Sequence, residues 1–506
     1  MNRQDPLLGA LVATCLALSG CSDGKLGEDS AEPTSELSRA ATQRIRSAVA
    51  SSLGQGLASA YSVAVWRDGA VIYAEAFGDR DPDATPATTN TLFQIGSDTK
   101  KLTAIALLQL VEAGELELDE TVADLLPELE LASDPGFLET VTVRDLLRQT
   151  SQLADYAPFT EVPDDDELAG IAYGRFAENE HARMPAGIAY SYSNPNYALA
   201  GLITETLADA PWADVVTEQV IEPLGLAHTY ARRDDALDAE SDLASAQGNT
   251  APVDSFDPFS AQQSELGWVA PEDEFDNAFI RPAGLVWSTA SDQATVLGFF
   301  ADGAPAVLSD ELRRAMMSEQ ATIYNHSEGV GYGYGLVTQS IYVSSAGTVH
   351  RVPFVWHNGG TLTMTSLSYL LPEQRVAVSV LANGAGESLE TVALVALEAA
   401  AGNRIPGPTE PPDLFGAPSD DLEAYAGVYS DDNLGEVTID WDGEDLTLHA
   451  PTVEELGVEL SSVEPVGRDL FVFTADGEPM DLSFYDSPDG TPHAYGVNRA
   501  FVLVRQ

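Results

Sequence analysis

The sequence predicts a protein of the α+β class, an α-β sandwich in which an antiparallel sheet is flanked by helices, followed by a small all-β barrel domain. Three observations predict this fold. Apolar residues alternate as they do in strands at 61–78 and again at 350–382. Helical patterns and Gly/Pro-rich loops lie between these stretches, and short alternating runs fill the chain after residue 420. We therefore expect one sheet built from both ends of the first domain, with a helical subdomain inserted between its halves.

The first half of this domain is expected to contain a helix, a hairpin and a longer helix. The segment 37–52 has the spacing of an amphipathic helix. A hairpin follows, because apolar residues alternate on both sides of Asp68-Gly69, a pair that favours a tight turn. After an extended segment at 92–96, a helical pattern runs over about 97–113 and ends before a glycine.

The second half is expected to complete the sheet. Three strand-like runs follow one another, VPFVWHNGG, SLSYLL and RVAVSVLAN, and a helical pattern covers about 388–401. A proline-rich linker then leads into runs such as EVTIDW and LFVFT, which are typical of a small all-β domain. The expected boundaries are 1–21 for a signal peptide with a lipobox, 22–37 for a flexible tether, 38–405 for the main domain, 406–420 for the linker and 421–506 for the barrel.

The charge of the chain excludes several classes of partner. Eighty Asp and Glu residues stand against 24 Lys and Arg, a net charge of −56. Such a surface repels nucleic-acid phosphates and anionic lipid headgroups, so we expect no nucleic acid among the partners. Both cysteines lie near the N-terminus, at Cys15 and Cys21, which excludes a disulfide framework in the body. We expect no cofactor and no metal; the acidic cluster 164–167 is interpreted as a solvated loop rather than a Ca²⁺ site.

The N-terminus has the features of a targeting segment. The apolar run 7–18 has signal-peptide length and is too short to span a bilayer. It ends in LSGC, which resembles a bacterial lipobox, in which the cysteine, here Cys21, becomes lipidated. We expect an exported protein with a lipid anchor in a bacterial membrane, facing the periplasm or the cell exterior. The alternative is an ordinary cleavable signal with a chance cysteine.

The first candidate for chemistry is the pair Ser97 and Lys100. A serine in the first turn of a helix has its Oγ near unsatisfied backbone N–H groups and the positive end of the helix dipole. A lysine three positions on lies on the same face, so its amine can reach that oxygen. Burial would lower the pKa of the amine and let it accept the serine proton. The alternative is a helix-capping serine with a surface lysine, since Ser22 and Lys25 repeat the spacing within the tether.

Two further motifs contain polar side chains at the boundaries of predicted elements. Tyr192 and Asn194 are spaced so that a phenol could relay a proton and a carboxamide could bind a substrate carbonyl. His357 ends a predicted strand and is followed by Gly359 and Gly360, which allow close approach of backbone and substrate. A backbone N–H in this segment could form an oxyanion hole with that of the serine, and the histidine could hold a substrate carboxylate or polarise the site. Taken alone, each motif is also consistent with an ordinary polar loop or turn.

The order of these motifs, Ser-x-x-Lys, Tyr-x-Asn and then His-x-Gly, resembles that of the serine β-lactamase and penicillin-binding-protein superfamily. The branch it resembles most contains class C β-lactamases, D-alanyl-D-alanine carboxypeptidases and related esterases, in which His-x-Gly often replaces Lys-Thr-Gly. The likeness covers about residues 45–400 and includes LFQIGSDTKKLTA, VTVRDLLRQTSQL and RPAGLVWSTASDQA. The segment YAGVY at 425–429 resembles the lipocalin-like barrel appended to some members.

The resemblance implies a role for each motif. Ser97 would be the acylated nucleophile, Lys100 its proton partner and Tyr192 a general base and acid, with the choice of base between the last two left open. The binding residues implied are Asn194 for the substrate, His357 in place of the lysine of the third motif, and the Gly359-Gly360 segment, whose second N–H would bind the oxyanion together with that of Ser97.

One motif departs from the family pattern. The usual His-Thr-Ser-Gly is Gln149-Thr150-Ser151-Gln152 in this chain. The family glycine often supplies a positive φ, which glutamine tolerates poorly. We therefore expect the loop beside the cleft to differ, and this departure leaves the substrate preference open.

The function predicted from these motifs is that of a serine hydrolase that forms an acyl-enzyme with amide or ester substrates. Candidate substrates are D-amino-acid peptides, small esters and β-lactams. The alternative is a protein of the same fold that is not an enzyme, either a penicillin or peptide sensor that is acylated without turnover or a structural scaffold. The complete set of Ser97, Lys100 and Tyr192 favours the enzyme, because a scaffold does not need it.

Overall fold

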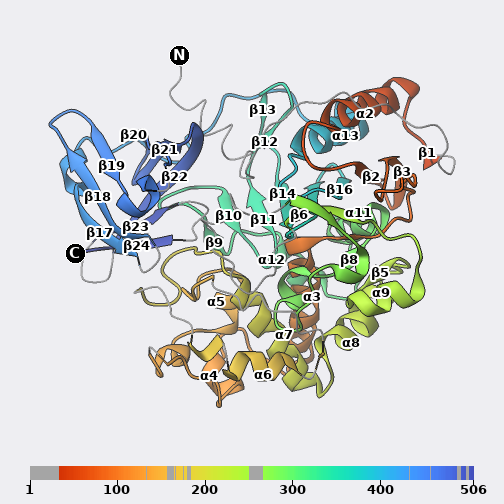
Figure 1. Cartoon of the computed structure of the whole chain (residues 1–506), viewed down its shortest axis with the longest axis horizontal. Helices are drawn as coiled ribbons and strands as arrows, with labels where there is room; N and C mark the ends of the chain where they lie inside the picture. The colour runs from red at the N-terminus through yellow and green to blue at the C-terminus, as the bar shows by residue number, and fades with distance from the viewer. Residues whose placement is uncertain are drawn as a thin grey trace.

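The structure, a computed structural model, consists of an α/β body and a C-terminal β-barrel, which is coloured blue in Figure 1. The predicted signal peptide and Cys21 lie outside the described residues. No helix in the described ranges has both the length and the apolar character needed to cross a membrane. The structure describes residues 34–132, 134–155, 164–165, 167–174, 176–178, 184–249, 266–431, 434–455, 457–486, 492–496 and 501–506.

A nine-stranded antiparallel sheet with the order β1-β3-β2-β16-β15-β14-β11-β10-β9 forms the centre of the body. Strand β2 pairs with β16 along its whole length, from Tyr61 opposite Ala382 to Arg67 opposite Val376. This pairing confirms that one sheet is built from both ends of the domain. The strands are β1 (Thr34–Ser35), β2 (Ala60–Arg67), β3 (Ala70–Gly78), β9 (Ala321–Thr322), β10 (Val330–Tyr332), β11 (Val337–Gln339), β14 (Phe354–Gly360), β15 (Thr365–Leu371) and β16 (Val376–Ala382).

Helices cover both faces of this sheet (Figure 1). On one face, helices α2 (Arg39–Ser52) and α13 (Glu390–Ala401) pack together over side chains such as Val63 and Val378. On the other face, α11 (Ala290–Asp302) covers the residues next to these in sequence, such as Ala64 and Ala377. Because successive side chains of a strand point to opposite faces, these almost continuously apolar strands can bury both faces.

The predicted hairpin is confirmed at Asp68 and Gly69, which have φ values of 51° and 99° between β2 and β3. Positive φ at both central residues is the requirement of the type I′ turn, whose twist suits two antiparallel strands. The hairpin thereby provides the two strands between β16 and the edge strand β1.

A helical subdomain lies below the sheet in Figure 1. Within it, helix α7 packs against α3 and α10, which lie close under the sheet. The helices are α3 (Lys100–Ala113), α4 (Val122–Leu125), α5 (Val143–Leu147), α6 (Glu167–Gly174), α7 (Asn194–Ala208), α8 (Trp212–Val216), α9 (Arg233–Ala239), α10 (Arg281–Gly284) and α12 (Asp310–Met316).

The C-terminal strands form a closed barrel in sequence order, and the pairing of β17 with β24 closes it. Its core contains aromatic side chains such as Tyr425, Phe471 and Phe484. The predicted all-β barrel is therefore confirmed. Its strands are β17 (Gly427–Asp431), β18 (Gly435–Trp441), β19 (Leu446–His449), β20 (Ser462–Gly467), β21 (Leu470–Ala475), β22 (Glu478–Asp486), β23 (Pro492–Gly496) and β24 (Phe501–Arg505).

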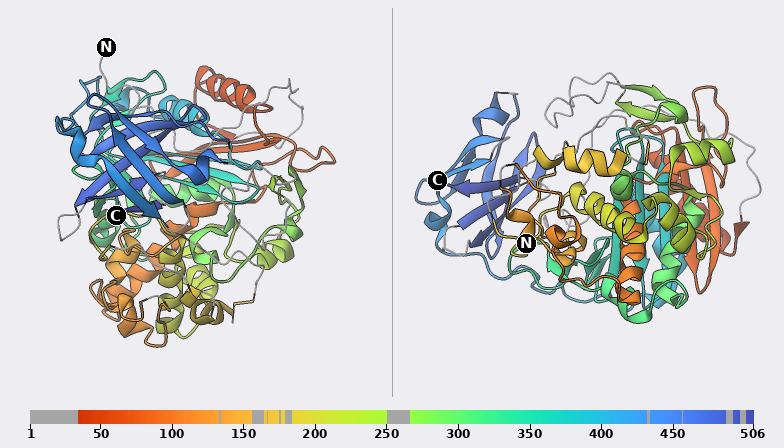
Figure 2. Two further views of the ribbon diagram at one scale, coloured as in Figure 1. Left: turned by 60° about the vertical axis from the view of Figure 1, so that its left-hand side comes forward. Right: turned by 90° about the horizontal axis from the view of Figure 1, so that it is seen from below.

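The barrel is packed against the body. The two views of Figure 2 show it from other sides. Leu414 and Phe415, which precede the first barrel strand, form one apolar cluster with Tyr324 of the body and Leu470 of the barrel. The ring centroids of Tyr324 and Phe415 are 5.5 Å apart and the rings meet edge to face, which is a favoured aromatic geometry.

Candidate active site

Ser97 lies in a tight turn between strand β4 (Phe93–Gln94) and helix α3. The expected helix begins with a 3-10 turn over 96–99 and continues as α3. Gly96 has φ of +53°, and a Cβ on it would lie 2.5 Å from the backbone nitrogen of Gly360. Glycine is required here because the turn must pass this close to the end of β14. The two motifs, far apart in sequence, are therefore in direct contact at the nucleophile.

The Lys100 amine has three hydrogen-bond partners in the interior of the body. It donates to the Oγ of Ser97 at 3.0 Å, to the Oδ1 of Asn194 at 2.7 Å and to the backbone carbonyl of Ala283 at 2.8 Å. The side chain is fully buried. The structure thus excludes the alternative of a surface lysine.

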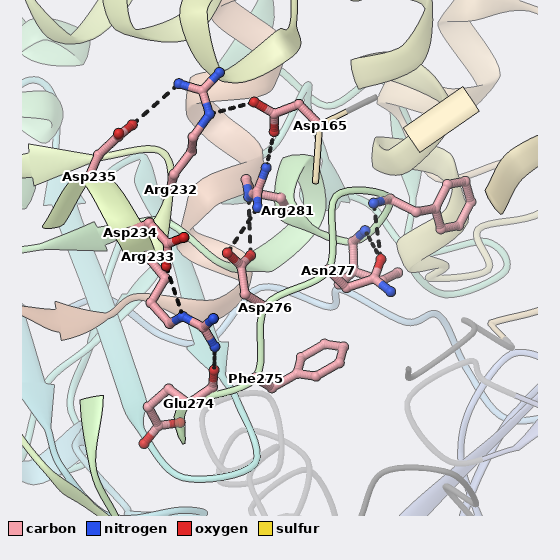
Figure 3. A network of polar contacts seen from close by, with 12 residues as sticks. Asp165, Arg232, Arg233, Asp234, Asp235, Glu274, Phe275, Asp276, Asn277 and Arg281 are labelled. Atoms are coloured by element: carbon pink, nitrogen blue, oxygen red, sulfur yellow. Dashed lines mark hydrogen bonds and ion pairs between the residues drawn. The ribbon is translucent and has the colours of Figure 1, made fainter. Parts of the chain in front are cut away.

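The third partner of Lys100 belongs to α10, which an arginine network holds in place (Figure 3). Buried Arg281 pairs with Asp276 at 2.9 Å and also with Asp165. Arg232 binds the other oxygen of Asp165 at 2.5 Å. The prediction of a solvated acidic loop is therefore wrong for Asp165, because two arginines from other elements bind its carboxylate.

Tyr192 lies beside both groups of the first motif. Its ring centroid is 4.8 Å from the Nζ of Lys100, and the Ser97 hydroxyl lowers the pKa of the phenol, although burial raises it by more. Asn194 begins helix α7, which packs against α3. The structure therefore brings together all four side chains that the first two motifs supply.

Burial determines the protonation of these groups. It lowers the pKa of Lys100 from 10.5 to about 7, against the opposing effect of the Asp155 carboxylate. Burial also raises the pKa of Tyr192 well above 10. At neutral pH a large fraction of the lysine is therefore a neutral amine, while the tyrosine is a neutral phenol.

The sequence motifs did not include Asp155, which lies at the edge of this site. It accepts the backbone N–H of Asn194 at 2.7 Å, and its second oxygen is 3.4 Å from the carboxamide nitrogen. Burial raises the pKa of Asp155. The carboxylate thus orients the start of α7 and adds negative potential near Lys100. Its position three residues after the Gln149–Gln152 motif was a signal that could have indicated it.

His357 is buried in β14, and both of its ring nitrogens have partners. Nδ1 is 2.6 Å from the carbonyl of Asn358, and Nε2 is 3.0 Å from the hydroxyl of Tyr332 on β10. A carbonyl can only accept, so Nδ1 carries the hydrogen and Nε2 accepts from the phenol. Burial lowers the pKa of His357 to about 4. The ring is therefore neutral at pH 7 and lies 6.3 Å, centroid to centroid, from that of Tyr192.

The backbone nitrogen of Gly360 lies beside Gly96, the residue before the nucleophile. The N–H of Thr361 donates to Met364 across the turn between β14 and β15, and Gly360 lies opposite Thr365. Because residues in an antiparallel ladder alternate between bonded and non-bonded pairs, the N–H of Gly360 points away from β15. Gly359 contacts the carbonyl of Ile95 so closely that a Cβ on it would lie 2.0 Å from that oxygen.

Behind the nucleophile lies a buried ion pair that the motifs did not predict. Lys101 and Asp98 are both fully buried, and their charged groups are 2.7 Å apart. Asp98 also accepts the hydroxyl of Ser368 on β15 at 2.7 Å. Through the bond between Asp98 and Ser368, the ion pair connects the turn that contains Ser97 to the central sheet.

The Gln149–Gln152 turn adopts the backbone that the family glycine would favour. Gln149 and Gln152 have φ values of 63° and 67°, in the left-handed region. Gln152 donates to the carbonyl of Ala189 at 2.6 Å, and the Gln149 carboxamide accepts the N–H of Ser193 at 3.0 Å. The left-handed backbone costs glutamine conformational energy. In this turn it is accompanied by side-chain hydrogen bonds to residues on both sides of Tyr192.

Comparison with known proteins shows the family of the chain. A family model described as Beta-lactamase matches residues 43–401. The chain belongs to the beta-lactamase family. Penicillin-binding protein 4 of Amycolatopsis lactamdurans is 37% identical to this beta-lactamase family member over 153 residues, which are 30% of this chain and 39% of that protein. The chain spans about two fifths of the length of the curated relatives it matches.

Two solved structures share the fold. SurE with D-Leu has a TM-score of 0.62 at 22% identity, and the match covers 92% of this chain and 99% of that chain. The D-amino acid amidase of Ochrobactrum anthropi SV3, complexed with L-phenylalanine amide, has a TM-score of 0.56 at 23% identity, with 72% of this chain and 99% of that chain covered. The family match shows the family of the chain, and these neighbours share its fold.

Proposed function

We propose that this protein is a serine hydrolase that cleaves amide or ester bonds through an acyl-enzyme on Ser97. The observation that carries the proposal is the buried amine of Lys100, which is 3.0 Å from the Oγ of Ser97 and has a pKa lowered to about 7. In its neutral form the amine donates its two hydrogens to Asn194 and Ala283, so that its lone pair can accept the hydroxyl proton as the Ser97 oxygen attacks a carbonyl.

The remaining groups have distinct tasks in this mechanism. The backbone N–H groups of Ser97 and Gly360 stabilise the oxyanion of the tetrahedral intermediate. Tyr192 passes a proton to the leaving amine or alcohol and regains one from the Lys100 ammonium, because its pKa lies well above 10. Water then attacks the acyl carbonyl and gives a proton to Lys100, the bond to the Ser97 oxygen breaks, and that oxygen takes the proton back as the acid leaves. We therefore assign Lys100 as the base and Tyr192 as the proton relay, and the lowered pKa of Lys100 supports this choice.

We further propose that the substrates carry no carboxylate group, such as D-amino-acid amides or small esters. His357 is neutral at pH 7 and its ring nitrogens are occupied, so it offers no cation to a substrate carboxylate. The net charge of −56 also disfavours anionic substrates. The likeness to a D-amino acid amidase supports an amide of a D-amino acid as the first substrate to test.

A labelled fluorophosphonate tests the nucleophile. The wild-type protein is expected to be labelled, Ser97→Ala to lose labelling, and the matched variant Ser22→Ala to keep it, because Ser22 has the same spacing to a lysine in the tether. Paired assays with D- and L-amino-acid amides, nitrophenyl esters and a chromogenic cephalosporin then define the substrate. Absence of labelling in the wild type would refute the acyl-enzyme, and labelling without turnover of any of these substrates would favour a sensor.

The predicted export and lipid anchor remain a separate proposal, based on the LSGC sequence that ends at Cys21. Metabolic labelling with a palmitate analogue tests it. The expected result is incorporation in the wild type and none in Cys21→Ser, and equal incorporation in both would contradict it.

A further inference from the structure

Tyr485, on strand β22 of the barrel, lies at the interface with the body. The residue is only 5% exposed and forms an apolar cluster with Met184 and Ala189. Its hydroxyl donates to the backbone carbonyl of Ile323 at 3.1 Å. One barrel side chain therefore contacts two segments of the body that are far apart in sequence. The right-hand view of Figure 2 shows the blue barrel beside the orange and yellow part of the body.

The first of these segments, 184–192, ends at Tyr192. Its opposite side is fixed to the Gln149–Gln152 turn, where the N–H of Gly187 donates to Thr150 at 2.8 Å and that of Ser191 donates to Gln149 at 2.8 Å. The same turn holds the carbonyl of Ala189. The segment is thus enclosed between the turn and Tyr485, a short distance along the chain from Tyr192.

The second segment leads to His357. Ile323 packs in a cluster with Tyr190, Tyr332 and Tyr192, and the hydroxyl of Tyr332 binds the histidine ring. The neighbouring barrel residue reinforces this contact, because the carbonyl of Phe484 accepts the Asn325 carboxamide at 2.8 Å. The end of β22 therefore holds the chain just before β10.

We propose that the barrel is a positioning element of the active site and that Tyr485 is the residue through which it holds Tyr192 and His357 around Ser97. The inference rests on the proposed function. Tyr485 touches neither the nucleophile nor its partners in the described contacts, so it acts through the two segments it joins. Its loss is expected to let the phenol of Tyr192 move relative to Lys100 and Ser97, which slows acylation more than it weakens substrate binding.

The test compares three variants of the full chain. Tyr485→Ala is expected to lower kcat and the fluorophosphonate labelling rate by about tenfold or more, with KM changed less than about threefold, because small misplacements of catalytic groups are costly. Tyr485→Phe keeps the ring but loses the bond to Ile323, and a smaller decrease of about two- to fivefold is expected. Phe415→Ala is the matched control, since it removes an aromatic ring from the same interface away from segment 184–192. It is expected to stay within about twofold of the wild type.

A second readout separates positioning from general damage. Because Tyr192 lies over the Lys100 amine, the pH midpoint of labelling is expected to shift in Tyr485→Ala and to stay unchanged in Phe415→Ala. Wild-type kinetics in a folded Tyr485→Ala variant, or equal losses in Tyr485→Ala and Phe415→Ala, would overturn the inference. If Tyr485→Ala does not fold, Tyr485→Leu and Tyr485→Phe replace it in the test. Wild-type kinetics in both of these variants would overturn the inference. A wild-type protein that is not labelled would refute the proposed function instead.

Discussion

The Nζ atom of Lys100 lies 3.0 Å from the Oγ of Ser97, in a place where the lysine is fully buried. Burial disfavours the ammonium form and lowers its pKa to about 7. A residue that would be a permanent cation on the surface is therefore able to accept a proton near neutral pH. The pH dependence of the reaction should follow this one group.

We predict that the acylation rate rises with pH and levels off above the pKa of Lys100. Below about pH 7 the amine is protonated and cannot accept the Ser97 proton, whereas above it the neutral form dominates. No alkaline decrease from Tyr192 is expected up to pH 10, because its pKa lies well above that value. Stopped-flow labelling across this range measures the profile. A rate that falls between pH 6 and 8 would contradict the role of Lys100.

Asp155→Asn is predicted to shift this profile toward lower pH. The Asp155 carboxylate raises the pKa of Lys100, so its removal leaves the burial effect unopposed. Asparagine keeps an oxygen for the N–H of Asn194, which Asp155 accepts at 2.7 Å. The measurement compares the pH midpoint of the labelling rate in the variant with that in the wild type. A shift toward higher pH is the outcome inconsistent with the proposed electrostatics.

Tyr192→Phe is predicted to lower kcat by about 10²- to 10⁴-fold, the usual contribution of a positioned proton-transfer group. The ring remains over Lys100, so the fold should be retained. Tyr197→Phe provides a matched control, because its buried hydroxyl donates to the carbonyl of Leu147 rather than to a catalytic group. That variant should lose about 1 kcal/mol of stability with little change in kcat. Comparable losses of kcat in the two variants would argue against the relay.

Lys101→Met is predicted to destabilise the body by about 3–5 kcal/mol, since it leaves the buried carboxylate of Asp98 without a counter-charge. The double variant Asp98→Asn with Lys101→Met should recover much of this loss, because it removes both buried charges. Urea unfolding monitored by fluorescence gives the comparison. A double variant less stable than the single one would show that the pair itself contributes the stability.

Two substitutions distinguish the effect of the Gln152 backbone conformation on stability from the effect of its side-chain hydrogen bond. Both Gln152→Ala and Gln152→Gly lose the bond to the carbonyl of Ala189. Glycine alone tolerates φ of 67° without strain, so the glycine variant should be more stable than the alanine variant by up to about 1 kcal/mol. Thermal unfolding of the two variants measures this difference. Equal stability would mean that the turn relaxes when the side chain is lost.

The sequence predicted the features that depend on local patterns. The Asp68-Gly69 turn, the strands that flank it and the Ser97–Lys100 spacing all follow from neighbouring residues, and the structure contains each. The Asp165 ion pairs were missed because their arginines lie on other elements of the fold. The Ala283 carbonyl that binds Lys100 could not be predicted, because a backbone oxygen has no residue-type signature.

The predicted roles of the third motif show the same limit. Gly359 and Gly360 were identified because close approach to the backbone needs glycine, and the structure brings Gly96 against both. The Tyr332 partner of His357 was not identified, because nothing in the sequence near Tyr332 indicates that its hydroxyl binds a histidine ring. Side-chain contacts between distant strands depend on the register of the assembled sheet, which periodicity alone does not specify.

The pairing of β2 with β16 has a consequence for how the molecule is made. During translation the hairpin that contains β2 emerges early, whereas its partner strand β16 is synthesised roughly 300 residues later. The free edge of β2 therefore stays unpaired until β16 has been made. Contacts of such long range slow folding because a large loop has to close first. The nascent polypeptide is therefore exposed to misassociation for most of its synthesis, and a chaperone that shields the first hairpin should increase the yield of folded protein.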